Sequence, residues 1–341
     1  MTQPLVSVII VTWNGRALLE QCLPSVVATT YPNVELILAD NASTDDTLAW
    51  VEATYPHIRI VRNAENWGFS RGNNEAIKVA KGEFVVLLNN DVEVTPGWLS
   101  PLVTHMSAHP AIGALQPKLL QYDDRSRFEY AGAAGGHLDA LGYPFARGRV
   151  FDHLEADTGQ HDSVSDIAWA TGAAMMLRRT ALDEVGLLDE RFFMHMEEID
   201  LCWRLWRAGY RVVAVPESVV FHIGGASLPQ ASPQKTLLNF RNNLLLLYKN
   251  LPVSQWPKVF AQRLILDGIA AMRFLAQGQV QNALAVFRAY AEAHVMKAAY
   301  DGQRTNATSD IPIYPRSIVR QYFLRRRHTY SALVAALSDS P

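Results

Sequence analysis

The sequence predicts an α/β fold built on an open parallel sheet with helices packed against it. Over the first hundred residues, short runs rich in β-branched residues alternate with longer runs whose apolar residues have helical spacing. Such strand–helix alternation is typical of a doubly wound parallel sheet. The chain has 341 residues, of which 49% are hydrophobic and 19% charged, so it is long enough to bury a large core.

Four strands and three helices are expected in this first part of the chain. The expected strands are residues 5–13, 34–40, 58–63 and 84–90, and the expected helices are residues 17–29, 44–55 and 70–80. The first strand, LVSVIIVTW, is a continuous β-branched run, which is typical of a strand buried on both faces. Ser43 or Thr44 is the expected N-cap of the second helix, because a side-chain oxygen there can accept a bond from a free N–H of the first turn.

The pattern becomes irregular after residue 110 and regular again after residue 165. The glycine- and alanine-rich stretch 130–150 is expected to form a mobile loop or a small hairpin. A strand and a helix are expected within 166–190. An amphipathic helix that ends at Gly209 should follow, and after it a late strand and a polar turn. Residues 234–300 predict helices with a break at 277–279. These boundaries predict a domain over residues 1–232, with halves 1–110 and 111–232, and a helical C-terminal region over 233–341.

Charge is unevenly distributed along the chain. Residues 250–341 carry 11 Lys and Arg against 5 Asp and Glu, a net of +6, whereas residues 1–249 carry 20 against 28, a net of −8. Two interpretations of the basic tail stay open. Its apolar helices pack on the rest of the chain or at a homodimer contact, or they dock on an anionic membrane surface. We expect no nucleic-acid partner.

The sequence predicts a cytoplasmic protein without a membrane span. Cys22 and Cys202 have no spacing for a disulfide or a metal site, which indicates reduced thiols. The apolar start lacks a basic n-region and turns polar within a dozen residues, so we expect a first strand there and not a signal peptide. No run of about 18 apolar residues is present.

Polar residues follow four consecutive expected strands. They are Thr12-Trp13-Asn14, Asp40-Asn41, Arg62-Asn63 and Asn89-Asn90-Asp91. One polar strand end is an ordinary turn, but ligands of open α/β sheets bind outside the carboxyl ends of the strands. Four such ends at one edge therefore predict a site of nucleotide size.

The glycine-rich phosphate loops of the common nucleotide-binding folds are missing. Only Gly15 follows the first strand, so a G-x-G-x-x-G turn is excluded, and a P-loop would need Gly-Lys-Ser/Thr. A divalent cation that bridges two phosphates is the alternative. Asp91 is the candidate ligand, although an Asx residue after a strand is also an ordinary turn former.

Five stretches in matching order and spacing resemble the inverting family-2 glycosyltransferases, which have the GT-A fold. They are VSVIIVTWNG, YPNVELILADNASTDDT, NAENWGFSRGNNEAIKVAKGEFVVLLNNDVEVTPGWL, WATGAAMMLRR and GLLDERFFMHMEEIDLCWRLWRAGY. The resemblance covers roughly residues 5–225 and is greatest to bacterial rhamnosyltransferase-type members that build cell-wall and surface polysaccharides. It implies transfer from a nucleoside-diphosphate sugar, dTDP-rhamnose or a UDP-sugar, to a saccharide or lipid-linked saccharide at the inner face of the plasma membrane.

The resemblance also implies roles for the residues of the first half, which would bind the nucleotide-sugar. The implied donor contacts are Thr12, Asn14, Asp40, Gly68, Phe69, Asn73 and Asn90, with Asp40 on the nucleobase. Asp91 matches the acid that binds Mg²⁺ or Mn²⁺. The two residues before it are asparagines where the family's D-x-D-type motif is acidic, so we expect weak metal retention without the nucleotide-sugar.

The second half would bind the acceptor and carry the catalytic base. Glu198 matches the second acid of the family's acidic pair and is the implied base, with Glu197 as the alternative. Acids in a first helical turn are also favoured by the helix dipole alone. His222 is either a metal or diphosphate ligand or simply a partly buried polar residue.

Two further residues match the segment beneath the acceptor. Trp169 would stack on a sugar or belong to the core, and Gly172 would let the backbone approach the donor sugar. Two other functions compete with glycosyl transfer. A sugar-nucleotide-forming nucleotidyltransferase would need a Gly-rich, basic loop after the first strand, which TWNGRALLE does not provide. A non-catalytic relative would lack Glu198 or Asp91, and both are present.

Overall fold

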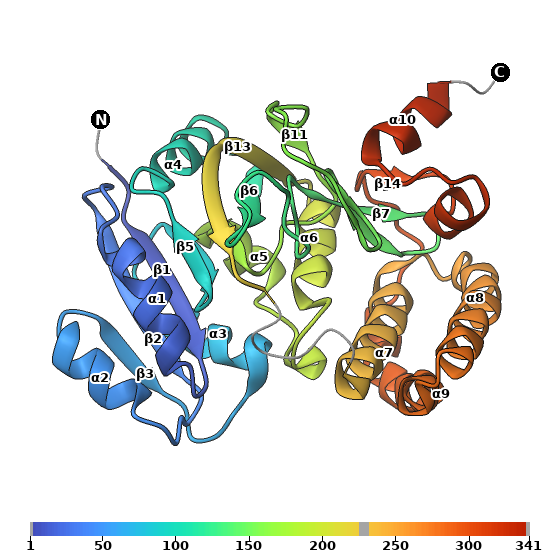
Figure 1. The fold of residues 1–341 in the computed structure, drawn as a ribbon, viewed down its shortest axis with the longest axis horizontal. Helices are drawn as coiled ribbons and strands as arrows, with labels where there is room; N and C mark the ends of the chain where they lie inside the picture. The colour runs from blue at the N-terminus through green and yellow to red at the C-terminus, as the bar shows by residue number, and fades with distance from the viewer. Residues whose placement is uncertain (1–2, 225–231, 339–341) are drawn as a thin grey trace.

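The computed structural model describes residues 3–224 and 232–338, which form a central mixed sheet with helices packed against it (Figure 1). The described strands of this sheet follow the order β11-β13-β6-β12-β4-β1-β2-β3, and β5 pairs with β13. Their bounds are β1 Val6–Thr12, β2 Val34–Asp40, β3 Arg59–Arg62, β4 Phe84–Asn89, β5 Val92–Val94, β6 Ile112–Gln121, β11 Ser165–Asp166, β12 Ala174–Arg178 and β13 Arg211–His222. The expected α/β class is therefore confirmed.

The first four strands are parallel neighbours, as the sequence predicts. Thr12 pairs with Asp40, and Val11 pairs with Asn89, so the polar strand ends meet at one edge. The connecting helices are α1 Arg16–Val27, α2 Thr47–Thr54 and α3 Gly68–Val79. The N-cap prediction for α2 is wrong. That helix begins at Thr47, where the Asp45 carboxylate accepts the backbone N–H, and the loop before it has another task described below.

No local sequence pattern predicts β6, although this strand lies in the middle of the sheet. Antiparallel β12 separates it from β4, and β13 runs parallel to it on the other side. The strand contains Gln116, Pro117 and Lys118, which break the apolar pattern. Each polar side chain is buried with partners: Gln116 bonds the backbone of Gly132 and Thr171, and the Lys118 ammonium lies 2.7 Å from Asp157 Oδ2.

The irregular stretch after β6 contains a second, smaller sheet. Its described strands follow the order β10-β9-β8-β7-β14, with bounds β7 Gly136–Asp139, β8 Pro144–Ala146, β9 Arg149–Val150, β10 His153–Leu154 and β14 Ile313–Tyr314. Strands β7 and β8 are antiparallel, which confirms the hairpin alternative for residues 130–150. Strand β14 comes from the C-terminal region and pairs in parallel with β7. In its described residues that region is thus helical with one short strand, which completes a sheet begun by β7 to β10.

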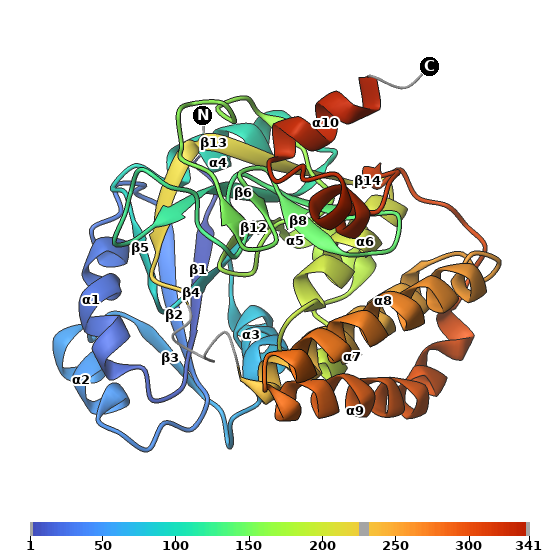
Figure 2. The ribbon, with the colours of Figure 1, turned by 45° about the vertical axis from the view of Figure 1, so that its right-hand side comes forward.

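Of the remaining helices, α4 to α6 accompany the second half of the sheet, and α7 to α10 belong to the C-terminal region (Figure 2). Their bounds are α4 Leu99–Ala108, α5 Arg179–Val185, α6 Glu197–Arg207, α7 Pro233–Asn250, α8 Trp256–Ala276, α9 Val280–Met296 and α10 Tyr330–Ser338. The predicted break at 277–279 and the end of α6 at a left-handed Gly209 are confirmed. The polar turn expected after His222 runs into residues 225–231, outside the described residues. Among the helices that are described, none combines the length and apolarity needed to cross a membrane.

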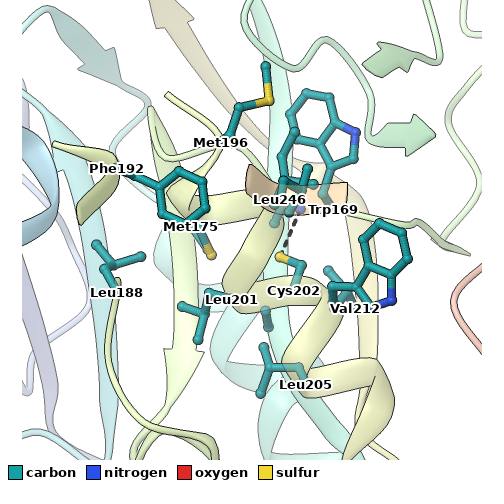
Figure 3. Close-up of a cluster of buried hydrophobic side chains, with 14 of the residues drawn as sticks. Trp169, Met175, Leu188, Phe192, Met196, Leu201, Cys202, Leu205, Val212 and Leu246 are labelled. Atoms are coloured by element: carbon teal, nitrogen blue, oxygen red, sulfur yellow. Dashed lines mark hydrogen bonds between the residues drawn. The ribbon is translucent and has the colours of Figure 1, made fainter. Parts of the chain in front are cut away.

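A hydrophobic cluster between the sheet, α6 and α7 fixes the position of α6 (Figure 3). The cluster includes Trp169, Met175, Phe192, Leu201 and Leu246. Cys202 lies within it and accepts a hydrogen bond from the Ala170 N–H at 3.3 Å. Burial raises the pKa of this thiol to about 12, so it is an inert packing residue.

Candidate active site

The polar ends of β1 and β4 are in direct contact. Asn90 donates a hydrogen bond from Nδ2 to the Thr12 hydroxyl at 3.0 Å. Gly15 packs against this pair so closely that an added Cβ would lie 2.1 Å from Thr12 Oγ1. A larger residue at Gly15 would therefore displace both side chains from the sheet edge.

Asp40 presents an unused acceptor at the end of β2. Its Oδ2 accepts from the Ser43 N–H at 3.0 Å, but its buried Oδ1 has no partner. A buried acceptor without a donor is costly, so this oxygen is free to accept a hydrogen bond from a ligand N–H. Asn14 shapes the same loop, because its Oδ1 accepts from the Thr44 N–H at 2.7 Å and its own N–H bonds Ser43 Oγ. Ser43 and Thr44 thus serve this edge and do not cap α2.

The start of α3 is joined to the loop that precedes α6. The backbone N–H groups of Phe69 and Ser70 donate to the Phe193 carbonyl at 2.8 and 3.1 Å. Gly68 has φ +69° and lies so close to Phe193 that a Cβ would be 2.6 Å from its carbonyl oxygen. Buried Asn73 donates to the Phe69 carbonyl and holds this first turn.

Gly172 and Trp169 are both buried against other side chains and do not form an exposed surface for a sugar. The Phe69 ring packs on Gly172, where a Cβ would lie 2.9 Å from Phe69 Cζ. Gly172 thus makes room for a side chain at the start of α3. The Trp169 indole lies within the hydrophobic cluster of Figure 3 and is 2% exposed. It packs against Gly136 and donates from Nε1 to the His137 carbonyl. This packing favours the core alternative for Trp169, and a stacking role stays a prediction without support from its position.

Asp91 and His222 lie together, with a third residue behind them that the sequence did not single out. Strand β5 pairs with β13 so that His222 lies opposite Val92, next to Asp91. His222 Nε2 is 3.1 Å from Asp91 Oδ1, and its Nδ1 is 3.1 Å from Glu129 Oε2. Glu129 follows β6 in the irregular stretch, where no local pattern marks it.

The charges of this cluster stabilise one another. Burial alone would lower the pKa of His222, but Glu129 and Asp91 raise it to about 10. Burial would raise the pKa of Asp91, but the charge and hydrogen bond of His222 hold it below its usual value. Asp91 is thus ionised and faces a nitrogen that carries a proton when no other cation is bound.

The donor set of this cluster fits a divalent cation in part. A carboxylate beside an imidazole Nε2, with a second carboxylate on the Nδ1 side, is the arrangement that orients a metal-binding histidine. Asp91 and His222 would be the ligands, and Glu129 would hold the ring. Within residues 3–224 and 232–338, no three His, Cys, Asp or Glu side chains are grouped to hold an ion by themselves. The cation would need further oxygens from a ligand, in agreement with the single carboxylate of the NND sequence.

The acidic pair Glu197 and Glu198 begins α6 and has no basic side chain paired with it in the described part of the chain. Glu197 Oε2 and Glu198 Oε2 are buried atoms without a hydrogen-bond partner. Burial raises the pKa of Glu198 to about 7, and burial together with the Glu198 charge raises the pKa of Glu197 well above its usual value. Asp200 in the same turn differs, because Arg204, Lys249 and Asn250 all bond it. Burial would raise the pKa of Asp200, but these partners lower it, so Asp200 is a structural ion.

The loop before this pair is strained and is held by the C-terminal region. Phe193, His195 and Met196 have φ of +64°, +70° and +75°, which is costly for residues with a Cβ. From α7, Asn242 Nδ2 lies 2.8 to 2.9 Å from the carbonyl oxygens of Phe192, Met194 and His195. One asparagine thereby fixes the loop that positions Glu197 and Glu198, and no local sequence pattern marks it.

Solved structures with a similar fold identify the architecture of this chain. The mannosyltransferase PcManGT from Pyrobaculum calidifontis, in complex with GDP-Man and Mn²⁺, aligns over 99% of this chain and 87% of its own, with TM-score 0.53 and 19% identity. GalNAc-T7, solved with UDP, GalNAc and Mn²⁺, aligns over 73% of this chain and 48% of its own, with TM-score 0.58 and 20% identity. This likeness shows the fold, which is that of the GT-A glycosyltransferases.

The family follows from the sequence comparisons. Residues 7–186 match the family model described as Glycosyl transferase family 2. An N-acetylglucosaminyl-diphospho-decaprenol L-rhamnosyltransferase of Mycobacterium tuberculosis is 32% identical over 230 residues, which cover 63% of this chain and 75% of that protein. The uncharacterized protein y4gI of Sinorhizobium fredii is 32% identical over 254 residues, but the chain spans only 27% of its length. The chain belongs to glycosyl transferase family 2 and is a glycosyltransferase, as the resemblance implied.

Proposed function

We propose that this glycosyltransferase inverts the anomeric centre and uses Glu198 as the base. The supporting observation is the unpartnered Glu198 oxygen, on a carboxyl whose pKa is about 7, at the start of a helix joined to the α3 side of the site. A base with a pKa near the working pH is the most effective. The acceptor hydroxyl passes its proton to Glu198 while its oxygen bonds the anomeric carbon. The bond from that carbon to the diphosphate breaks, and its electron pair leaves with the diphosphate.

The donor would be held at the ends of β1, β2 and β4. The free Oδ1 of Asp40 fits the imide N–H of uracil or thymine, and the Thr12–Asn90 pair lies beside it on the same edge. Asp91 and His222 would hold Mg²⁺ or Mn²⁺, which when bound would offset the charge of the departing diphosphate. Both solved relatives described above contain Mn²⁺ and a nucleotide or nucleotide-sugar, which supports this assignment.

The acceptor would be a saccharide or a lipid-linked saccharide of cell-surface polysaccharide synthesis. The support is the Mycobacterium tuberculosis relative, whose name specifies a diphospho-decaprenol acceptor and rhamnosyl transfer. We propose dTDP-rhamnose or a UDP-sugar as the donor. An acceptor on a lipid carrier would place the enzyme at the cytoplasmic face of the plasma membrane.

A donor panel tests this function directly. UDP-, dTDP- and GDP-sugars would be added to the full chain with and without Mn²⁺, and the unfolding temperature recorded. Ligand at 100 times its Kd stabilises a fold by about 2.7 kcal/mol, so a bound donor is readily detected. A shift that requires Mn²⁺ and occurs with dTDP-rhamnose alone would support the narrow assignment. No shift with any donor would contradict the proposed function.

A further inference from the structure

Helix α8 buries an ion pair on its inner face and exposes aliphatic side chains on its outer face. The inner face, repeating every fourth residue, is Val259, Arg263, Asp267 and Ala271, all buried. On the opposite side Ile265, Ile269 and Met272 are 65%, 61% and 63% exposed. A helix on the surface of a protein in water normally shows the reverse distribution.

The inner face of α8 fixes this orientation. Arg263 and Asp267 form a buried ion pair with an Nη2–Oδ2 distance of 3.1 Å. The Tyr143 and Tyr290 hydroxyls donate to the two Asp267 oxygens at 2.7 and 2.8 Å, and Arg263 also bonds Asn243 of α7. Turning the helix to bury its aliphatic face would break this network and leave buried charges without partners. The outward aliphatic face is therefore a fixed feature of the fold.

Neighbouring segments also expose apolar side chains. Helix α9 packs beside α8 at the edge of the molecule and exposes Leu284 and Phe287 (Figures 1 and 2). We call the outward residues the α8–α9 face: Leu264, Ile265, Ile269, Met272, Leu284 and Phe287. Arg273 lies 5.5 Å from the exposed Phe323 ring, which brings the turn at 320–324 to the end of α8. Exposed apolar groups gathered in this way mark an interaction surface.

The exposed charges around this face are basic. Lys258 and Arg273 lie toward the two ends of α8, and Arg325 and Arg326 follow the turn beside Arg273. The acids of α8 and α9 are not available to offset them. Asp267 is buried in its ion pair, and Glu292 bonds Arg241 and Arg288.

We propose that the α8–α9 face docks on the surface of an anionic lipid bilayer. An aliphatic helical face with basic residues around it is what an interfacial helix needs: the apolar side chains enter the headgroup boundary while the cations meet lipid phosphates. A second copy of the chain fits less well, because a two-fold contact would set the basic rim against itself. The proposal rests on this surface alone and is independent of the sugar transferred.

Vesicle binding tests the proposal apart from catalysis. The full chain would be sedimented with vesicles of phosphatidylglycerol and phosphatidylcholine, and with phosphatidylcholine alone. We expect binding to the anionic vesicles that weakens with salt. Changing Ile265→Gln and Met272→Gln together should lower the partition coefficient at least tenfold, whereas Val164→Gln, an exposed aliphatic residue elsewhere, should leave it unchanged. Lys258→Gln with Arg273→Gln should weaken anionic binding, and Lys81→Gln should not.

A site-specific probe distinguishes this face from adventitious binding. The native thiols are buried, so Ile269→Cys can be labelled selectively with an environment-sensitive dye. Its emission should shift to the blue on anionic vesicles, while dye at Val164→Cys should not respond. Three results would overturn the proposal: no sedimentation of the wild type with anionic vesicles, equal binding by the Ile265/Met272 variant, or a wild-type dimer in light scattering that this variant converts to a monomer.

Discussion

Two buried acidic clusters belong to the candidate active site, and they differ in how their charge is balanced. In the first, Asp91 and Glu129 lie on opposite sides of the His222 ring, and the pKa of Asp91 is lowered. In the second, Glu197 and Glu198 are neighbours with unpartnered oxygens, and the pKa of each is raised. Burial favours a higher pKa for Asp91, Glu197 and Glu198 alike. The presence or absence of a cationic partner therefore decides whether the pKa is lowered or raised.

The difference suits the carboxyl groups of the two clusters to two kinds of chemistry. A carboxylate that stays ionised beside an imidazole suits a cation, whereas a carboxyl near its titration point at neutral pH suits proton transfer. Asp200 supports this comparison from within α6. It lies two residues from Glu198, but its basic partners keep its pKa low.

The largest effect is expected from Asp91→Asn. The change keeps the shape but removes the charge that faces His222, and with it the proposed metal ligand. Transition-state stabilisation by a metal is worth several kcal/mol, so transfer should fall about 1,000-fold or more. Nucleotide-sugar affinity, measured by calorimetry with and without Mn²⁺, should become indifferent to the metal.

An exposed acid provides the control for this change. Asp183→Asn on α5 alters the net charge equally and should leave both transfer and the Mn²⁺ dependence intact. If Asp91→Asn still bound the donor more tightly with Mn²⁺ than without it, the cation would be held elsewhere. The first cluster would then not be the metal site.

A slightly smaller effect is expected from Glu198→Gln. Removal of a general base typically costs about 10²- to 10⁴-fold in rate. Donor binding should be nearly unchanged, because the amide keeps the size of the side chain. Glu197→Gln is the matched comparison, and the variant with the greater loss of kcat identifies the base. Full turnover by Glu198→Gln would remove it from that role.

The pH profile of the wild type should carry the signature of the same group. A base must be deprotonated, and the Glu198 carboxyl with a pKa of about 7 is protonated below that pH. kcat/KM should therefore rise with pH and level off above about pH 7, and this rise should be absent from any residual activity of Glu198→Gln. A profile that is flat from pH 5 to 8 would contradict a base with a raised pKa.

The nucleotide-binding half could be predicted from the sequence because its signals are local. Strands β1 to β4 are apolar runs bounded by polar residues, and parallel pairing brings their ends together without further information. Strand β6 could not be predicted because Gln116 and Lys118 interrupt its apolar pattern. Only their partners Thr171 and Asp157 explain why these polar residues are buried. Those partners are 55 and 39 residues away in the chain.

The candidate site shows the same limit. Asp91, His222 and the acidic pair were marked by residue type at a strand end or a helix start. Glu129 had no such mark, because it becomes significant only when β6 and β13 pair. Gly172 and Trp169 were recognised by type, but the side that each one faces depends on Phe69 and Gly136, which no local pattern reveals.

The smallest loss of activity is expected from Asn242→Ala, which acts on Glu197 and Glu198 through the loop that precedes them. Without its amide, the carbonyl groups of Met194 and His195 lose the Asn242 donor, whereas the Phe192 carbonyl keeps the Met194 N–H. The strained loop before Glu197 can then relax. A displacement of about 1 Å in a reacting group can cost up to 100-fold, so we expect kcat to fall about 10- to 100-fold with a smaller change in the KM for the donor. Asn239→Ala, one turn earlier on α7, is the control.

The pH profile separates positioning by Asn242 from general stabilisation. If the asparagine holds Glu198 in its buried setting, a relaxed loop lets water reach the carboxyl. The midpoint of the rise in kcat/KM should then move below pH 7, toward the value of an ordinary glutamate. If Asn242→Ala lowers the unfolding temperature but leaves kcat and this midpoint unchanged, α7 stabilises the fold only. The raised pKa of the acidic pair would then depend on its own burial and not on the C-terminal region.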